Sequence, residues 1–270
     1  MTKQWERCTA YSEAGGATKS TTTLSLAVAC AEENPDDDVI VADCDPRGAT
    51  TKWTGAQPVK EGLHIGAILG NEDVEGWADD LAVSLDASGG WPRNLRVIPS
   101  ARSVSNREKN ADDHADVRLK RSLEGVEAHV FFDAPNRQGG MIIQNILTAT
   151  RNVIYAAKPN EDGLDGVDGA KETVTKFRAH KQSLGVPDHL REVGIILGCA
   201  WRGAVWTRDA LRAVEEFERT SPGMLLTPYV EDKVIVSESR AAGVWYGKYA
   251  KGKSVASAYR TIYLERVRTA

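Results

Sequence analysis

The chain has no long apolar run and few cysteines. No stretch of its 270 residues approaches the roughly 18 consecutive apolar residues that a membrane-spanning helix needs. The first residues also lack the apolar region of a secretory signal. The four cysteines form no Cys-x-x-Cys pair, which argues against a zinc site or a disulfide framework and favours a reducing compartment. We therefore expect a cytoplasmic protein and no membrane partner.

The charge balance has no strong bias, since 34 basic residues stand against 38 acidic ones and the net charge is −4. Global charge therefore does not require a nucleic-acid partner. With 41% hydrophobic residues, the chain is long enough to bury the core of one large domain. No internal repeat or low-complexity linker is visible, so we place no domain boundary within residues 1–270.

The order of apolar patterns indicates the fold class. Short β-rich runs alternate with helical patterns, which is typical of a parallel sheet covered by helices. We expect strands near residues 4–11, 39–42, 95–98, 128–132, 152–157, 193–198 and 224–228. We expect helices at residues 20–33, 115–125, 139–149, 164–183, 206–219 and 254–268, and loops at 71–93 and 102–114. The predicted fold is α/β, a mostly parallel twisted sheet flanked by helices.

A loop that can hold phosphate follows the first predicted strand. A Gly-Gly turn, then Lys19-Ser20, leads directly into an apolar helical pattern. Backbone N–H groups and the positive end of the helix dipole suit phosphate oxygens there, while Lys19 would reach the terminal phosphates and Ser20 would ligate Mg²⁺. The pattern is degraded, because Glu13 and Thr18 stand where G-x-x-x-x-G-K-[ST] has glycines. The nucleotide contacts are expected from Gly15, Gly16, Ala17, Thr18, Lys19, Ser20 and Thr21.

Two later strands are predicted to end in acids. Asp43 and Asp45 follow the second strand, and Asp133 follows the strand at 128–132. Ligands of open parallel sheets bind beyond the carboxyl ends of the strands, so these acids and the loop are expected to converge on one crevice. Asp133 would hold Mg²⁺ through water, and Asp45 would align the attacking water behind the γ-phosphorus. Asp43 would support either Mg²⁺ or the loop. An acid that merely ends a buried strand is the alternative for each position taken alone.

Taken together, these motifs resemble those of the ParA-type ATPases, the deviant-Walker family that also contains MinD. Family members carry K-G-G-x-x-K-[ST], then D-x-D-P-Q-G, then a D-x-P strand end. Here these segments read Ala14-Gly-Gly-Ala-Thr-Lys19-Ser20, Asp43-Cys-Asp45-Pro-Arg-Gly48 and Asp133-Ala-Pro135. The resemblance covers nearly the whole chain and implies one ParA-like nucleotide-binding domain over residues 1–270, with ATP and Mg²⁺ as cofactors. It also implies a homodimer formed across the nucleotide, and Pro228 with its neighbours flanking the base.

The chain departs from the family at its signature lysine, which is Ala14 here. In relatives that lysine reaches the partner subunit's phosphates, so its loss predicts weak hydrolysis or none. Arg47, where relatives have Gln, and Arg137 are candidate replacements, although a surface charge is the favoured alternative for each. Gly198 stands where relatives often have an Asn that contacts adenine, which leaves the base preference open.

The last 38 residues are basic. Residues 233–270 hold eight Lys or Arg and two Glu, with aromatic residues interleaved. Such clusters fit sequence-independent contact with DNA phosphates, while a solvated face over core aromatics is the alternative. ParA-like proteins bind DNA nonspecifically, and we expect this chain to match the short members, which lack an N-terminal helix-turn-helix domain. The expected DNA contacts are Arg240, Lys248, Lys251, Lys253 and Arg260.

The resulting hypothesis is a ParA-type partition ATPase that acts at the nucleoid with a ParB-like centromere-binding partner. Three rivals stay open. One is a nucleotide-gated DNA scaffold with little or no hydrolysis, which the missing lysine favours. Another is a metabolic P-loop enzyme, which would need no basic segment at residues 233–270. A third is a MinD-like membrane ATPase, which the few apolar residues near the C-terminus disfavour.

Overall fold

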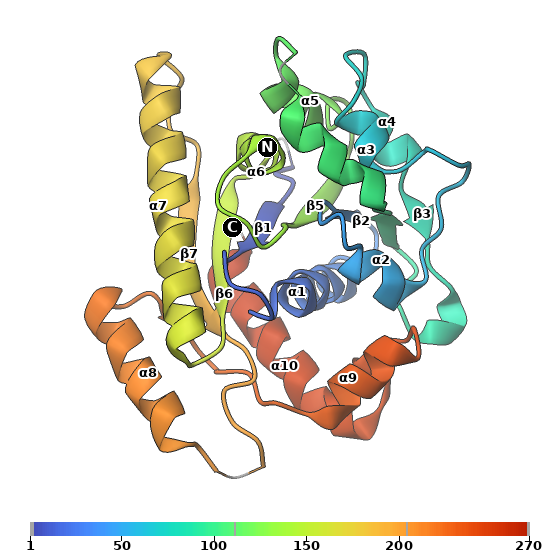
Figure 1. Ribbon diagram of the computed structural model, residues 1–270. Helices are drawn as coiled ribbons and strands as arrows, with labels where there is room; N and C mark the ends of the chain where they lie inside the picture. The colour runs from blue at the N-terminus through green and yellow to red at the C-terminus, as the bar shows by residue number, and fades with distance from the viewer. Residues whose placement is uncertain (1–2, 111, 204, 269–270) are drawn as a thin grey trace.

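A computed structural model describes residues 3–110, 112–203 and 205–268 of the chain. Its centre is an eight-stranded sheet of order β3-β4-β2-β5-β1-β6-β7-β8, shown in Figure 1. The strands are β1 (Arg7–Tyr11), β2 (Asp38–Asp43), β3 (Val83–Ser84), β4 (Leu95–Ile98), β5 (Ala128–Asp133), β6 (Asn152–Ala157), β7 (Arg191–Leu197) and β8 (Leu225–Leu226). Only β3 runs antiparallel to its neighbour, so the predicted mostly parallel sheet is confirmed.

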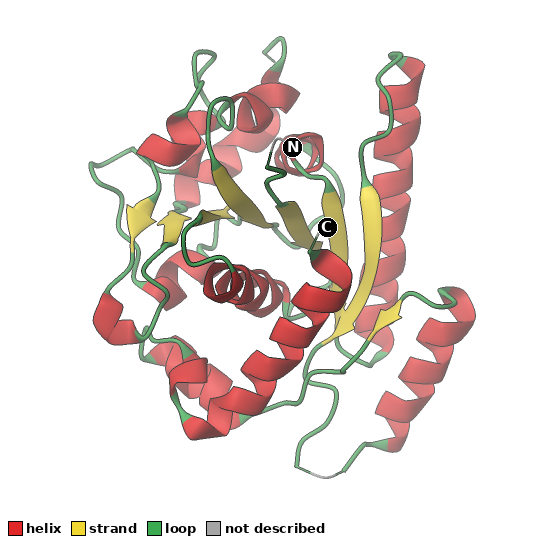
Figure 2. Cartoon of the chain, turned by 180° about the vertical axis from the view of Figure 1, so that it is seen from behind, coloured by secondary structure: helices red, strands yellow, loops and turns green. Residues whose placement is uncertain are grey.

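Helices cover both faces of this sheet, as the view from behind in Figure 2 also shows. They are α1 (Lys19–Glu33), α2 (Ala49–Thr54), α3 (Ile65–Ile68), α4 (Trp77–Asp80), α5 (Arg118–Arg121), α6 (Met141–Ala149), α7 (Glu161–Ser183), α8 (Arg208–Thr220), α9 (Val234–Ala241) and α10 (Lys253–Ile262). No helix in the described part of the chain is long and apolar enough to span a bilayer.

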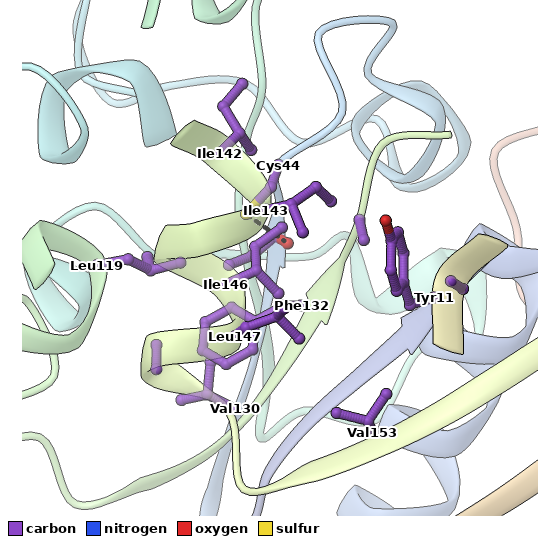
Figure 3. Packing of buried hydrophobic residues seen from close by; sticks show 14 of the residues in the cluster. Tyr11, Cys44, Leu119, Val130, Phe132, Ile142, Ile143, Ile146, Leu147 and Val153 are labelled. Atoms are coloured by element: carbon purple, nitrogen blue, oxygen red, sulfur yellow. Dashed lines mark hydrogen bonds between the residues drawn. The ribbon is translucent and has the colours of Figure 1, made fainter. Parts of the chain in front are cut away.

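The strand residues alternate between two hydrophobic clusters, because successive side chains of a strand point to opposite faces. On β5, Val130 and Phe132 pack in the cluster that holds α6, while Phe131 packs in the cluster that holds α1 and α10. Figure 3 shows the first cluster, in which Ile142 and Ile146 of α6 lie over β5. Burial on both faces explains why the strands are continuous apolar runs.

The short elements escaped the sequence patterns. The segment at 71–93, expected to be a loop, contains α4 and β3, and 102–114 contains a 3₁₀ helix at Arg102–Lys109. Helices α2, α3 and α9 were not expected either. None of these elements exceeds eight residues, so none repeats an apolar period often enough to be recognised. Tertiary contacts hold them instead, as where Arg107 Nε donates to the Gly66 carbonyl at 3.0 Å.

The C-terminal segment packs on α1 through tyrosine hydroxyls. Tyr246 lies 2.6 Å from the Ser25 hydroxyl, and Tyr259 lies 3.1 Å from that of Thr22. The helix predicted at 254–268 is α10 followed by a π-helical turn at Tyr263–Val267. These contacts join the basic segment to the helix that begins at the Gly-Gly loop.

Candidate functional site

The β1–α1 loop has the backbone of a phosphate-binding turn. Gly16 has a φ of 70°, a left-handed conformation that favours glycine. Helix α1 begins directly at Lys19, whose Nζ donates to the Ala14 carbonyl at 2.9 Å. The N-terminal turn of α1 carries no acidic side chain, so its free N–H groups face no competing negative charge from that turn.

A cavity of about 520 Å³ opens over this loop. It extends from the end of β2 past the loop to the residues that follow β6, β7 and β8, and α9 and α10 close its far side. Its lining includes six of the seven predicted loop contacts and Asp45. The remaining lining residues are Arg47, Ala49, Lys52, Lys158, Gly198, Cys199, Val230, Glu231, Asp232, Lys233, Val236, Ser237, Arg240, Val255 and Tyr259.

Asp43 is fully buried below the cavity and fixes the start of α2. Its Oδ2 accepts from the N–H and the hydroxyl of Thr51, at 2.8 and 2.7 Å, and its Oδ1 accepts from the Asp45 N–H at 3.2 Å. Burial, together with the neighbouring Asp133 carboxylate, raises the pKa of Asp43 above its ordinary value. Neither Thr51 nor Asp45 belongs to the β1–α1 loop, so these contacts hold the turn between β2 and α2, and both roles predicted for Asp43 stay predictions.

Asp133 is also fully buried, but only one of its oxygens is used. Oδ2 accepts from the Thr50 hydroxyl at 2.8 Å, whereas Oδ1 has no hydrogen-bond partner among the described residues. Burial raises the pKa of Asp133, and the hydroxyls of Ser20 and Thr50 oppose this effect. A buried oxygen without a partner is costly unless a ligand or water completes it.

Asp45 lines the cavity and is paired with a cation. The Arg47 guanidinium donates to its Oδ2 at 2.8 Å, and the Arg47 N–H donates to its Oδ1 at 2.9 Å. Arg47 also donates to the Asn136 side chain. The second candidate replacement for the signature lysine, Arg137, lies 3.0 Å from the buried carboxylate of Glu108 and does not line the cavity. Both arginines are therefore engaged in ion pairs in the ligand-free chain.

Lys19 is buried under the loop and its protonation is sensitive to its surroundings. Burial lowers the pKa of Lys19 to about 8, while the nearby Asp133 carboxylate raises it and Arg47 lowers it further. Negative charge brought into the cavity would favour the protonated ammonium. A phosphate ligand and Lys19 thus suit each other electrostatically.

The other end of the cavity holds an unusual backbone. Thr18 and Cys199 have φ angles of 65° and 53°, in the left-handed region that costs an L residue roughly 1–2 kcal/mol. A β-branched residue is rare there. The strand-end glycine, Gly198, lies directly between Cys199 and the Thr18 side chain. The sequence predicts Thr18 as a nucleotide contact and as a departure from glycine, but it gives no sign of this backbone conformation.

Two predicted nucleotide contacts lie outside the cavity. Pro228 is exposed in the turn after β8, and the residues that follow it, from Val230 to Lys233, line the cavity in its place. Strand β8 ends two residues earlier than predicted, at Leu226, which leaves Pro228 outside this cavity, and its contact with the base stays a prediction. Gly15 lies with Ala14 on a second cavity of about 420 Å³, beside Asp162 and Asp165.

The basic segment is divided by the fold. Arg240 lines the cavity, and the side chains of Lys248 and Arg260 are engaged with the Ser88 carbonyl and with Glu33. Lys251 and Lys253 are exposed. The aromatics expected beside the lysines are mostly core residues, because Trp245 and Tyr246 are buried against Trp53 and Trp91 of distant segments.

The oxygen donors at the cavity fit Mg²⁺ better than they fit a metal coordinated by protein side chains alone. No group of three or more His, Cys, Asp or Glu side chains gathers in a metal-binding arrangement within the described residues. Ser20 lines the cavity, and the unpartnered Asp133 oxygen lies behind it. Mg²⁺ is usually bound by one or two side chains, phosphate oxygens and waters, which matches this sparse oxygen set.

Sequence reasoning missed Lys158, Cys199 and the residues 230–233. Each follows the carboxyl end of a parallel strand, as the predicted acids do. The same strand-end rule, applied to β6, β7 and β8, would have found them. Lys52 and the α9 residues had no such signal, because they reach the cavity from helices that only the tertiary structure reveals.

Comparison with known proteins gives a consistent fold. A family model described as an AAA domain matches residues 8–186, and no curated protein sequence matches the chain. The fold is similar to that of apo McdA from Cyanothece, with a TM-score of 0.78, 18% identity and coverage of 97% of this chain and 100% of that one. A plasmid partition protein from Borrelia burgdorferi bound to AMPPNP is similar with a TM-score of 0.74 and 18% identity, and the match covers 97% of this chain and 99% of that one. Cobyrinic acid a,c-diamide synthase from Mycobacterium smegmatis, with an ATP analogue and magnesium, is similar with a TM-score of 0.72 and 21% identity, and the match covers 96% of this chain and 93% of that one.

Proposed function

The chain belongs to the AAA domain family and has the fold of ParA-type P-loop ATPases, and from this premise we propose that it is a Mg-ATP-dependent positioning ATPase. The observation that carries the proposal is the convergence of the β1–α1 loop, Lys19 and Asp45 on one cavity, with the unpartnered Asp133 oxygen behind it. The McdA and partition-protein structures with bound ATP or AMPPNP support the choice of nucleotide.

Each residue then has a role that its position supports. Loop N–H groups and Lys19 bind the phosphates, and Ser20 with Asp133 holds Mg²⁺, which when bound neutralises charge between the β and γ phosphates. Asp45 orients the attacking water, once Arg47 yields part of its ion pair to the γ-phosphate. Asp43 keeps the Asp45 backbone in place.

The wider proposal is that residues 1–270 act as one nucleotide-binding domain that dimerises on ATP, binds DNA without sequence preference at the nucleoid and releases it with a ParB-like partner. The DNA part rests on Lys251 and Lys253, which are exposed beside α10 and have no ion-pair partner within the described residues. Arg240 is better assigned to the nucleotide cavity.

The nucleotide part is tested by Lys19→Ala with calorimetry of Mg-ATP binding. We expect binding to be abolished, because charge-assisted contacts to the terminal phosphates are lost. Lys176→Ala, on the exposed face of α7, is the matched control and should bind as the parent does. Unchanged ATP affinity in Lys19→Ala would contradict the proposal.

The DNA part is tested with the double variant Lys251→Ala, Lys253→Ala and a random duplex in the presence of ATP. We expect weaker binding at every sequence, and a log–log salt slope smaller by about 1 for each lysine that touches a phosphate. Lys176→Ala again serves as the control. A parent chain that binds no DNA, or a double variant that binds with the parent's slope, removes these residues from the proposal.

A second candidate is a nucleotide-gated DNA scaffold with little hydrolysis. Ala14 in place of the signature lysine and the Asp45–Arg47 pair both favour it. Phosphate release measured with ATP, DNA and a partner present separates the two, since the scaffold would bind ATP and DNA but release no phosphate above background.

A further inference from the structure

The contact between Thr18 and Gly198 is unusually close. A Cβ at position 198 would lie 2.6 Å from the Thr18 Oγ1 and 2.9 Å from its Cγ2, distances that real Cβ atoms do not show. The Thr18 side chain therefore rests on bare backbone at the end of β7. Any residue larger than glycine at 198 would push it aside.

The Thr18 hydroxyl is the second unusual feature of this corner. Its Oγ1 is buried and has no hydrogen-bond partner among the described residues. The backbone at Thr18 is left-handed, as it is at Cys199, and both residues line the nucleotide cavity. Strained residues and unpaired buried hydroxyls occur where a ligand completes them, and the cavity that Thr18 and Cys199 line is where such a ligand would bind.

The sheet order places this corner relative to a bound nucleotide. The loop follows β1, and Asp45 follows β2, which lies on the β5 side of β1. Gly198 follows β7, on the opposite side of β1 beyond β6. The same cavity continues from Lys19 and Asp45 to Gly198, so a nucleotide with its terminal phosphates between Lys19 and Asp45 has room for its sugar and base toward β7.

We propose that the Thr18 hydroxyl binds the nucleoside part of the nucleotide, an inference that rests on the proposed function. Because Gly198 has no side chain, it leaves the space that the Thr18 side chain needs. The hydroxyl can donate to or accept from the sugar or the base edge. Thr18 is thus a specificity-determining residue, distinct from the loop N–H groups that bind phosphate.

The test compares Thr18→Val, which keeps the shape and loses the hydroxyl, with Thr18→Ser, which keeps the hydroxyl. Binding of Mg-ATP and of inorganic tripolyphosphate is measured for both, the latter by displacement of a fluorescent ATP analogue. We expect Thr18→Val to weaken ATP binding about five- to tenfold, as loss of one hydrogen bond does, and Thr18→Ser to stay within about twofold. Tripolyphosphate affinity should match the parent in both variants.

A double-mutant cycle tests the role of Gly198. Gly198→Ala should weaken ATP binding as much as Thr18→Val does, and should have no further effect in the Thr18→Gly background, where its Cβ meets no side chain. Thr18→Gly relieves the left-handed strain, so its melting temperature should equal or exceed the parent's. Lost ATP binding in that variant is then not unfolding.

The outcomes separate the two proposals. A parent chain that binds neither ATP nor tripolyphosphate sinks the proposed function. A parent that binds ATP while Thr18→Val binds it equally well overturns only the role of Thr18. Equal losses for ATP and tripolyphosphate would also overturn it, because the hydroxyl would then contact phosphate.

Discussion

The two ends of the nucleotide cavity are built differently. Toward β2 most polar groups hold one another: Asp43 bonds Thr51, Asp45 pairs with Arg47, and Asp133 bonds Thr50 through Oδ2, although its Oδ1 has no partner among the described residues. Toward β7 the backbone is strained and the Thr18 hydroxyl is unpaired. The β2 end is preorganised for charge, which is what phosphoryl chemistry requires. Under our proposal a ligand completes the β7 end, which would suit that end to selecting the nucleotide.

The variant Asp45→Asn gives the strongest test of this difference between the two ends of the cavity. We expect turnover to fall at least about 100-fold, because the side chain that orients the water loses its charge, while the Kd for ATP stays within about threefold. Phosphate release and calorimetry measure the two quantities. Asp209→Asn, on the exposed face of α8, is the control.

If Asp45→Asn hydrolyses ATP at the parent rate, the catalytic assignment at the β2 end is wrong. A large loss of ATP affinity instead would mean that Asp45 shapes the pocket. Variants at the β7 end should show the opposite pattern, with altered Kd and little change in turnover at saturating ATP.

The next effect in size is that of Asp133→Asn. The amide can keep the Thr50 contact but removes the charge behind the Mg²⁺ site. In this variant we expect the factor by which Mg²⁺ strengthens ATP binding to be about 10–100-fold smaller, as when other outer-sphere carboxylates of a metal site are removed. ATP affinity measured with Mg²⁺ and with EDTA gives this ratio, and a ratio equal to the parent's would make Asp133 purely structural.

The smallest expected effect is a pH dependence carried by Lys19. Its pKa of about 8 means that the ammonium is mostly protonated at pH 7 and mostly neutral at pH 9. Phosphate binds the protonated form and raises the pKa, so ATP affinity should fall about tenfold from pH 7 to pH 9.

Calorimetry in buffers of different ionisation enthalpy checks this prediction. Proton uptake on binding should be near zero at pH 7 and approach one proton at pH 9. Thr18→Val, at the other end of the cavity, should keep the same pH dependence. Affinity that does not vary with pH would place Lys19 away from the phosphates.

Much of the β2 end could be predicted from the sequence. Asp45 follows β2, Asp133 ends β5, and Lys19 follows the loop after β1, and parallel strands bring their carboxyl ends to one edge. The long strands and helices were recognisable because their periods repeat several times. The sequence also gives Ala14 at the position where the resemblance predicts a lysine, and that identity does not depend on the fold.

Only the tertiary structure decided the rest, because it depends on contacts between residues far apart in the chain. Nothing local to Thr18 indicates that its hydroxyl rests on Gly198. The eight Lys and Arg residues of the basic segment likewise do not indicate, from sequence alone, that Arg240 lines the cavity while Arg260 pairs with Glu33. Charge is a property of the residue and is read from sequence, whereas burial and partnership are properties of the packed chain.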